Sequence, residues 1–244
     1  MNIAILGYGK MGHAIHEEAL QQGHCIVATI DNEEDWKEQA ASLIHADVAI
    51  EFSQPDQAIN NILRCFEHHL PIVVGTTGWY QHFEEIRQRC INEGQSLFYA
   101  SNFSIGMNIL FRLNEQLGTY AKQFGYSLKI DETHHIHKLD KPSGTAITIA
   151  NQLLHNDSDY QSWHIEEDAT PITSNDPHSI PIHVTREGEV FGIHSVTLQN
   201  DKDKVTLTHQ AFNRQGFAQG AVKAAEFLVG KTGIFTMNDL FNTL

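Results

Sequence analysis

Residues 2–12 read N-I-A-I-L-G-Y-G-K-M-G, a short apolar run that leads into a glycine-rich turn. The apolar run predicts a buried strand, and a helical pattern follows to about residue 22. Gly-x-Gly-x-x-Gly between a strand and a helix is typical of a dinucleotide-binding turn. Gly7 permits the tight turn, Gly9 lets a pyrophosphate approach, and Gly12 lets the helix pack on the strand. A tight strand–helix turn without a ligand is the plainer alternative.

A carboxylate stands where such a turn needs one. A second strand is expected at 25–30, and it ends at Asp31, about 20 residues after the glycine turn, where a carboxylate can accept hydrogen bonds from the adenine ribose. Residues 33–35 are all acidic, and residues 32–35 contain no Arg or Lys. A 2′-phosphate would be repelled there, so the sequence predicts a preference for NADH over NADPH. Lys10 is the counterargument, because a lysine on the turn can reach that phosphate.

The alternation of strands and helices continues through the first hundred residues. Strands are expected at 46–52, 71–74 and 96–100, with helices at 55–69 and 81–93. This order predicts a Rossmann-type, doubly wound parallel sheet, whose ligands lie beyond the carboxyl ends of the strands. Ordinary turn chemistry is the alternative for the later loops. The residues expected to contact the cofactor are Gly7, Tyr8, Gly9, Lys10, Met11, Gly12, Asp31, Phe52, Ser53, Gly75, Thr76, Thr77, Ser101, Asn102 and Phe103.

Residues 132–146, E-T-H-H-I-H-K-L-D-K-P-S-G-T-A, concentrate side chains that carry protons. A strand is expected before them at 126–131, and a helix after them, with Ser143 as its N-cap. The cluster is therefore expected in a loop that ends at a helix N-terminus, which favours anions. The sequence predicts that Ser143, Gly144 and Thr145 hold a carboxylate or phosphate, with His134, His135 and Lys138 beside it as proton donors and charge partners.

The three histidines of this stretch also raise a zinc site as an alternative. His134 and His135 point to opposite sides of an extended chain. No His-x-x-x-His spacing and no nearby Cys supports a metal, so none is predicted. A plain surface loop is the other alternative.

The second half of the chain predicts a smaller α+β domain with an open mixed sheet. A long helix is expected at 104–124, and an irregular, mobile loop at 156–177. Three segments alternate like antiparallel strands, with hairpin turns at 186–189 and 199–203; the segments are 180–186, 189–198 and 204–211. A final helix at 218–229 would pack back on the first domain. The predicted domains are 1–103 with 213–244 for the dinucleotide, and 104–212 for the substrate and for oligomerisation.

The composition limits the partners. The chain has 244 residues and a formal charge of −14, which disfavours nucleic acid and anionic membranes. Three scattered cysteines, Cys25, Cys65 and Cys90, suggest reduced thiols. No signal peptide and no apolar run of about 20 residues is recognised. A cytoplasmic enzyme acting on a small molecule is expected.

The motifs together resemble those of the 4-hydroxy-tetrahydrodipicolinate reductase (dihydrodipicolinate reductase) family, essentially from end to end. The most specific of them is His134-His135-x-x-Lys138-x-Asp140-x-Pro142-Ser143-Gly144-Thr145-Ala146. The supporting motifs are Gly9-Lys10-Met11-Gly12, Phe52-Ser53-x-Pro55, Gly75-Thr76-Thr77-Gly78, Asn102-Phe103-Ser104-x-Gly106 and Arg186-x-Gly188-x-x-x-Gly192-x-His194.

The resemblance implies that NADH or NADPH reduces a cyclic, unsaturated imine dicarboxylate to tetrahydrodipicolinate in the diaminopimelate route of lysine biosynthesis. It implies Lys138 as the proton donor and His134 as a second candidate acid. His135, Gly144 and Thr145 would bind a substrate carboxylate. It also implies a homotetramer and a hinge that closes the domains on the substrate.

The chain departs from the family pattern at Gln54, where some relatives carry Arg, and in the acidic run after Asp31, where they carry a basic residue. These departures bear on cofactor preference. Two rival functions stay open: another NAD-dependent dehydrogenase of the same architecture, and an NAD-binding sensor without catalysis.

Overall fold

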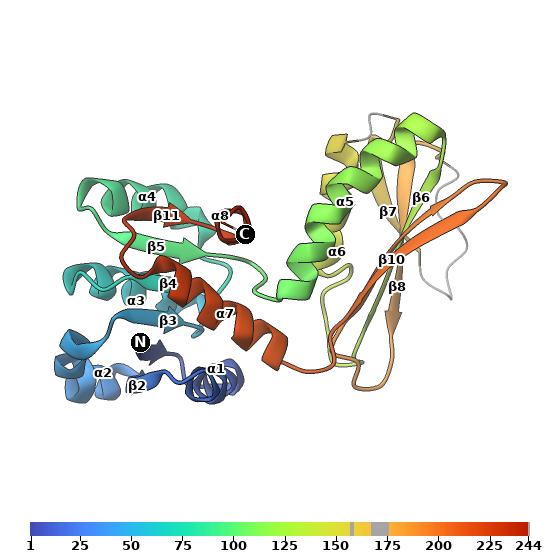
Figure 1. Cartoon of the computed structure of the whole chain (residues 1–244). Coiled ribbons are helices and arrows are strands. Elements are labelled where there is room, and N and C mark those ends of the chain that lie inside the picture. Colours follow the sequence, from blue (N-terminus) through green and yellow to red (C-terminus); the bar gives the residue numbers. More distant parts are fainter. Residues whose placement is uncertain (157–158, 167–175, 244) are drawn as a thin grey trace. The chain divides into compact units, whose positions relative to one another are not determined.

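The computed structural model describes residues 1–156, 159–166 and 176–243. The chain divides into two compact units (Figure 1). Unit 1 comprises Met1–Ile105 and Arg214–Leu244, and unit 2 comprises Gly106–Asn213. Unit 1 is therefore built from two separated parts of the chain.

Unit 1 is a Rossmann-type sheet of six parallel strands in the order β11-β5-β4-β3-β1-β2. The strands are β1 (Asn2–Leu6), β2 (Cys25–Ile30), β3 (Val48–Glu51), β4 (Ile72–Val74), β5 (Ser96–Tyr99) and β11 (Gly233–Phe235). The helical elements are α1 (Lys10–Gln21), α2 (Glu33–Gln39), η1 (Ala40–His45), α3 (Pro55–Glu67), η2 (Tyr80–His82), α4 (Phe83–Asn92), α7 (Gln215–Leu228) and α8 (Met237–Phe241).

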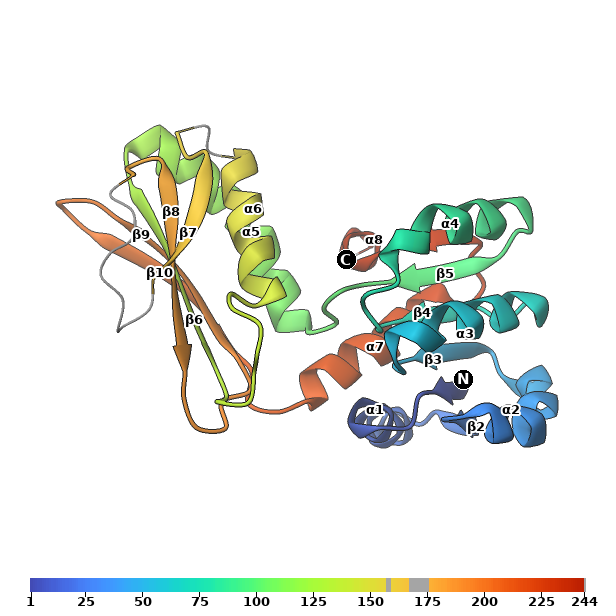
Figure 2. The ribbon, with the colours of Figure 1, turned by 180° about the vertical axis from the view of Figure 1, so that it is seen from behind.

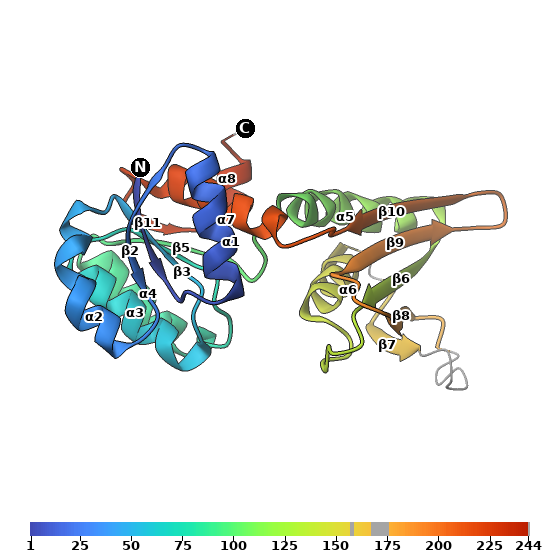
Figure 3. The ribbon, with the colours of Figure 1, turned by 90° about the horizontal axis from the view of Figure 1, so that it is seen from below.

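Helices cover both faces of this sheet, with α2, α3 and α4 on one side and α1 and α7 on the other (Figure 3). Alternate residues of β1 supply the two cores: Ala4 and Leu6 face the first set of helices, and Ile3 and Ile5 face the second. Burial on both faces is the reason these strands read as continuous apolar runs. The predicted doubly wound sheet is confirmed.

Among the α-helices and strands of unit 1, three were not predicted: α2, β11 and α8. Helix α2 begins after Asn32, whose side-chain oxygen accepts hydrogen bonds from the N–H groups of Glu34 (2.8 Å) and Asp35 (3.1 Å). The acidic first turn of α2 suits the positive end of the helix dipole. The acidic run after Asp31 therefore has a structural reason besides any effect on the cofactor.

Unit 2 is a mixed sheet of five strands in the order β10-β9-β6-β8-β7, with α5 and α6 on one face (Figure 2). Its elements are α5 (Ile105–Phe124), β6 (Ser127–His134), α6 (Gly144–Asn156), β7 (Ser162–Glu166), β8 (Ser179–Arg186), β9 (Ile193–Gln199) and β10 (Lys204–Gln210). The predicted open mixed sheet is confirmed. Across the described residues, no helix is both long and apolar enough to cross a membrane.

Strand pairing in unit 2 departs from the predictions. The hairpin predicted at 186–189 is wrong, because β6 lies between β8 and β9 and β8 runs parallel to it. The turn instead bonds to the end of β6 and the loop after it: Glu187 N–H donates to the His134 carbonyl, and His135 N–H to the Val190 carbonyl, each at 2.8 Å. The turn at 199–203 does join the antiparallel pair β9 and β10.

The loop predicted at 156–177 is only partly described. Strand β7 lies inside it, which corrects that part of the prediction. Residues 157–158 and 167–175 of the same segment lie outside the described residues.

Candidate active site

Unit 1 contains a cavity of about 480 Å³ at the carboxyl ends of β1, β2 and β3. Five of the predicted cofactor residues line it, together with Asn32, Glu33, Gln54 and Gln57; the five are Gly7, Gly9, Asp31, Phe52 and Ser53. The strand order reverses between β1 and β3, and this is the place where doubly wound sheets bind dinucleotides. The cavity is therefore placed where the sequence predicts a dinucleotide.

The glycines of the turn are required by close packing. A Cβ on Gly7, which has φ +88°, would lie 2.4 Å from the Phe52 carbonyl oxygen, and one on Gly12 would lie 2.3 Å from the Gly7 oxygen. Gly9 is the N-cap of α1 and provides no side-chain cap, and no other group lies within 4 Å of a Cβ placed there. The start of α1 is thus open to a phosphate, which fits a dinucleotide.

Asp31 closes the turn from the side. Its carboxylate accepts a hydrogen bond from the Tyr8 N–H at 2.6 Å, inside the predicted turn. The Asp31 carboxylate therefore has two roles. It holds the glycine turn in place, and it lines the cavity where a ribose is expected.

Two further groups of predicted cofactor residues lie on the same edge of the sheet: Gly75, Thr76 and Thr77 after β4, and Ser101, Asn102 and Phe103 after β5. Gly75 lies against the Phe52 ring, where a Cβ would be 2.1 Å from Cζ, and the Phe52 and Phe103 ring centroids are 5.5 Å apart. The Phe103 side chain is buried in the core and Thr76 is also buried, whereas Thr77 is exposed. Phe52 borders the cavity of unit 1, whereas the residues after β4 and β5 are not part of its lining.

A buried carboxyl that the sequence reasoning missed holds the loop after β3. Glu51 has no exposed surface; one of its oxygens accepts hydrogen bonds from the Ser53 N–H (3.0 Å) and from the Ser53 hydroxyl. Burial raises the pKa of Glu51 above its usual range. The Ser53 hydroxyl is therefore engaged inside the protein.

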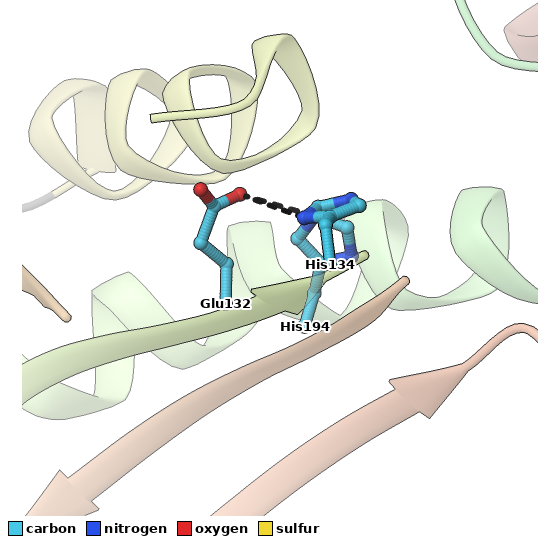
Figure 4. Close-up of side chains that lie close together, drawn as sticks. All are labelled: Glu132, His134 and His194. Atoms are coloured by element: carbon cyan, nitrogen blue, oxygen red, sulfur yellow. Dashed lines mark ion pairs between the residues drawn. The ribbon is translucent and has the colours of Figure 1, made fainter. Parts of the chain in front are cut away.

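In unit 2 the strand register brings three ionisable side chains together. Strand β6 is longer than predicted and includes Glu132 and His134 on the buried face that Leu128 and Ile130 begin. Glu132 faces His194 across the β6–β9 pair. Figure 4 shows the Glu132 carboxylate directed toward both imidazoles: its Oε2 lies 3.5 Å from His134 Nδ1 and 3.8 Å from His194 Nε2.

Ser143 joins this cluster to the start of α6. Both oxygens of Glu132 accept a hydrogen bond from the Ser143 N–H at 3.1 Å. The Ser143 oxygen accepts the Ala146 N–H at 3.2 Å, which confirms the predicted N-cap, and the hydroxyl lies 3.2 Å from His194 Nε2. Ser143 is thus buried and occupied, whereas Gly144 is exposed at the first turn of the helix. Ser143 is therefore engaged inside the protein, and its contact with a substrate carboxylate stays a prediction.

Arg186 organises the loop that carries Lys138. Its guanidinium donates to Glu132 Oε1 at 3.1 Å, to the Asp140 carbonyl at 2.6 Å and to the Lys138 carbonyl at 3.3 Å. The half-buried Lys138 ammonium lies 2.8 Å from a carboxylate oxygen of Asp140. The half-buried His135 follows the end of β6, and its ring centroid lies 5.9 Å from that of His137.

Burial governs protonation in this network. It lowers the pKa of His134 to about 4, with Lys138 and Arg186 acting in the same direction and Glu132 opposing them. It lowers the pKa of His194 to about 3, and the neighbouring His134 adds to the effect. Both imidazoles are therefore neutral near pH 7 before a ligand arrives.

These shifts predict the pH dependence of folding. The folded-state pKa of His194 lies below the ordinary 6.5, so the unfolded chain binds the proton more readily. The stabilisation is complete above pH 6.5 and is lost as the pH falls, by roughly 1.4 kcal/mol per pH unit. We expect the free energy of unfolding, measured in urea between pH 7 and pH 4.5, to fall less steeply with pH in His194→Gln than in the wild type. The variant of an exposed histidine, His137→Gln, should show the same pH dependence as the wild type. Parallel wild-type and His194→Gln curves would contradict this account.

The cluster also has the chemistry of a metal site, since ligand atoms of Glu132, His134 and His194 lie within 4.8 Å of one another. Its surroundings oppose a cation, because Arg186 already pairs with Glu132 and the Ser143 N–H, just before α6, donates to the same carboxylate. The prediction that no metal is bound is kept on this physical ground.

Sequence reasoning did not list three residues of this network: Glu132, Arg186 and His194. The sequence does contain a signal for Arg186 and His194, because both belong to the Arg186-x-Gly188-x-x-x-Gly192-x-His194 motif. Gly192 in that motif lies against the His134 ring, where a Cβ would be 3.1 Å from Nε2. The motif therefore packs against the histidine-rich strand.

The Rossmann-type unit and the unit with the His–Lys network are those of a nicotinamide-dependent oxidoreductase. Two family models match the chain: "Dihydrodipicolinate reductase, N-terminus" over residues 1–103 and "Dihydrodipicolinate reductase, C-terminus" over residues 106–241. The chain belongs to the dihydrodipicolinate reductase family.

Individual relatives agree with this assignment. The chain is 46% identical over 245 aligned positions to the 4-hydroxy-tetrahydrodipicolinate reductase of Christiangramia forsetii, covering 100% of this chain and 99% of the relative. It is 33% identical to the enzyme of that name from Neisseria gonorrhoeae, covering 82% and 74%. The dipicolinate-bound dihydrodipicolinate reductase of Paenisporosarcina sp. TG-14 shares the fold, with a TM-score of 0.77, 22% identity and 97% of each chain covered.

Proposed function

We propose that this chain reduces 4-hydroxy-tetrahydrodipicolinate to tetrahydrodipicolinate with NADH or NADPH, in the diaminopimelate route of lysine biosynthesis. Family membership along both units supports the reaction. The observation that carries the proposal is the Glu132–Arg186 pair, which holds the Lys138 loop and the start of α6 in one site. Such a site can bind a dicarboxylate and deliver a proton.

The reaction consumes one hydride and one proton and releases water. The reduced nicotinamide supplies the hydride when bound. Lys138 donates the proton, and His134 is the second candidate acid. His135, with the exposed Gly144 and the adjoining Thr145, binds a substrate carboxylate at the start of α6, where helix N–H groups and the helix dipole favour an anion.

The rival functions have less support. A semialdehyde dehydrogenase would need a nucleophilic cysteine, but Cys65 and Cys90 are buried in unit 1 and Cys25 begins β2. An NAD-binding sensor would gain nothing from the two ion pairs of unit 2, Lys138 with Asp140 and Arg186 with Glu132.

We infer a preference for NADH, supported by Asp31 and Glu33, which both line the unit 1 cavity. Glu33 also pairs with Arg64 at 2.8 Å and so neutralises a nearby cation. The Glu33→Gln variant is expected to raise kcat/KM for NADPH several-fold relative to NADH, because it removes one repulsive charge and releases Arg64. Glu34→Gln, in the same helical turn but outside the cavity lining, is the control. A wild type that strongly prefers NADPH would contradict the inference.

The other expected properties are also proposals. The substrate is a small dicarboxylate, and neither nucleic acid nor a membrane is a partner of this acidic chain. A cytoplasmic location is supported by three free cysteines. A homotetramer is supported by the family resemblance and by the open sheet of unit 2, in which α5 and α6 cover one face.

A coupled assay tests the proposed reaction. A synthase generates fresh 4-hydroxy-tetrahydrodipicolinate, and the oxidation of NADH and of NADPH is followed by absorbance. The proposal expects oxidation that depends on both the synthase and this chain. A wild type that oxidises neither cofactor in the presence of the substrate would refute it.

A further inference from the structure

We propose that Glu132 is a positioning residue that couples binding of a substrate carboxylate at the start of α6 to protonation of His134. The inference rests on the proposed function. It assigns a role to a buried carboxylate that neither substrate binding nor proton donation directly requires.

The first part of the coupling is mechanical. Glu132 has 1% of its surface exposed, and both of its oxygens accept the Ser143 N–H at 3.1 Å. Ser143 caps α6 through the Ala146 N–H, so the carboxylate fixes the turn that presents Gly144 and Thr145. Because backbone N–H groups bind anions only when they are held in place, the anion site depends on Glu132.

The second part is electrostatic. Glu132 Oε2 lies 3.5 Å from His134 Nδ1, an atom that is buried and has no hydrogen-bond partner within the described chain. A negative charge at this distance favours the imidazolium, whereas burial disfavours it. Glu132 is therefore the nearest carboxylate able to keep a proton on His134.

The other charged groups around His134 come from three directions. Lys138 and Asp140 lie on the following loop, Arg186 lies beside it on β8, and the His194 ring centroid is 5.0 Å away on β9. The two cations lower the proton affinity of His134, and Asp140, which is paired with Lys138, opposes them more weakly than Glu132 does. The free site thus stays neutral at His134 until further negative charge arrives.

A bound dicarboxylate supplies that charge. It brings negative charge to the cations and the start of α6, so it reduces the repulsion that opposes the imidazolium. The proton affinity of His134 then rises on binding. Glu132 determines the proton affinity that His134 has before the ligand binds. Without Glu132 the same substrate would leave His134 unprotonated near neutral pH.

The test compares Glu132→Gln with Glu189→Gln. Both replace a carboxylate by an amide of the same shape, but Glu189 forms an exposed pair with His137 at 3.0 Å. Imidazole NMR resonances, assigned with His134→Asn, are titrated in the ligand-free protein and with saturating dipicolinate and NADH. We expect dipicolinate to raise the pKa of His134 in the wild type and in Glu189→Gln. In Glu132→Gln the pKa is expected to be lower by roughly one to three pH units, both free and bound.

Kinetics supply a second readout. The pH at which kcat declines is expected to move downward in Glu132→Gln, whereas a purely structural role would lower kcat equally at every pH. If Glu132→Gln does not fold, Glu132→Asp withdraws the charge by one methylene and should give a smaller change in the same direction. Unchanged His134 titration in the substituted protein, or no response of the wild type to dipicolinate, would overturn the coupling. Both results differ from a failure to oxidise NADH, which is the result that would refute the proposed function.

Discussion

Replacing Lys138 by Ala is expected to reduce kcat by about 10²–10⁴-fold, the usual effect of removing a positioned acid. The ammonium lies on the loop that Arg186 holds, beside Asp140 at 2.8 Å and within the electrostatic reach of His134. The dissociation constant for NADH should stay unchanged, because the glycine turn belongs to unit 1. Steady-state kinetics and nucleotide fluorescence titration measure the two quantities.

Lys129 provides the matched control. It pairs with Asp131 at 2.7 Å in the same unit, on the face of β6 away from the buried cluster. Lys129→Ala should keep kcat within a factor of two or so, as surface ion pairs contribute little. A Lys138→Ala protein with turnover within tenfold of the wild type would remove Lys138 from the mechanism and would favour the sensor reading.

Replacing Arg186 by Met is expected to destabilise unit 2 by about 3–5 kcal/mol, because it leaves the Glu132 carboxylate buried without its cation. The guanidinium also holds the carbonyls of Lys138 and Asp140, so the loop should become mobile as well. Urea unfolding followed by circular dichroism measures the free energy, and hydrogen exchange in residues 136–142 reports on the loop.

The control for this prediction is Lys129→Met, which removes a cation from an exposed pair and should cost less than about 1 kcal/mol. An Arg186→Met protein as stable as the control would mean that Glu132 is satisfied without Arg186. The account of the site would then need another source of order for the loop.

The parts of the fold with strong local signals were predictable. The turn at Gly7 and the apolar strands of unit 1 depend on residues adjacent in sequence. The sequence alone therefore predicts which elements they are and how they follow one another along the chain. The short strand β11 was not predictable from the sequence, because its three residues form a strand only by pairing with β5. Helix α2 is not evident from the sequence, because an acidic run is consistent both with cofactor selectivity and with the first turn of a helix.

The site in unit 2 was predicted in part for a related reason. Strand β6 was expected to end at residue 131, because the apolar alternation of Leu128 and Ile130 gives way to Glu132 and His134 on the same buried face. His194 and Arg186 reach this face only through pairing with distant strands. The sequence shows which side chains carry charge, but register decides which of them meet.

Transfer of deuterium from NADH tests the central claim most directly. NADH labelled with deuterium at C4, on one face or the other in separate preparations, is incubated with the chain and freshly generated 4-hydroxy-tetrahydrodipicolinate, and the product is analysed by mass spectrometry. The account predicts that one of the two preparations yields tetrahydrodipicolinate carrying one deuterium for each NADH oxidised. Unlabelled product from both preparations, or NADH left unoxidised, would contradict it.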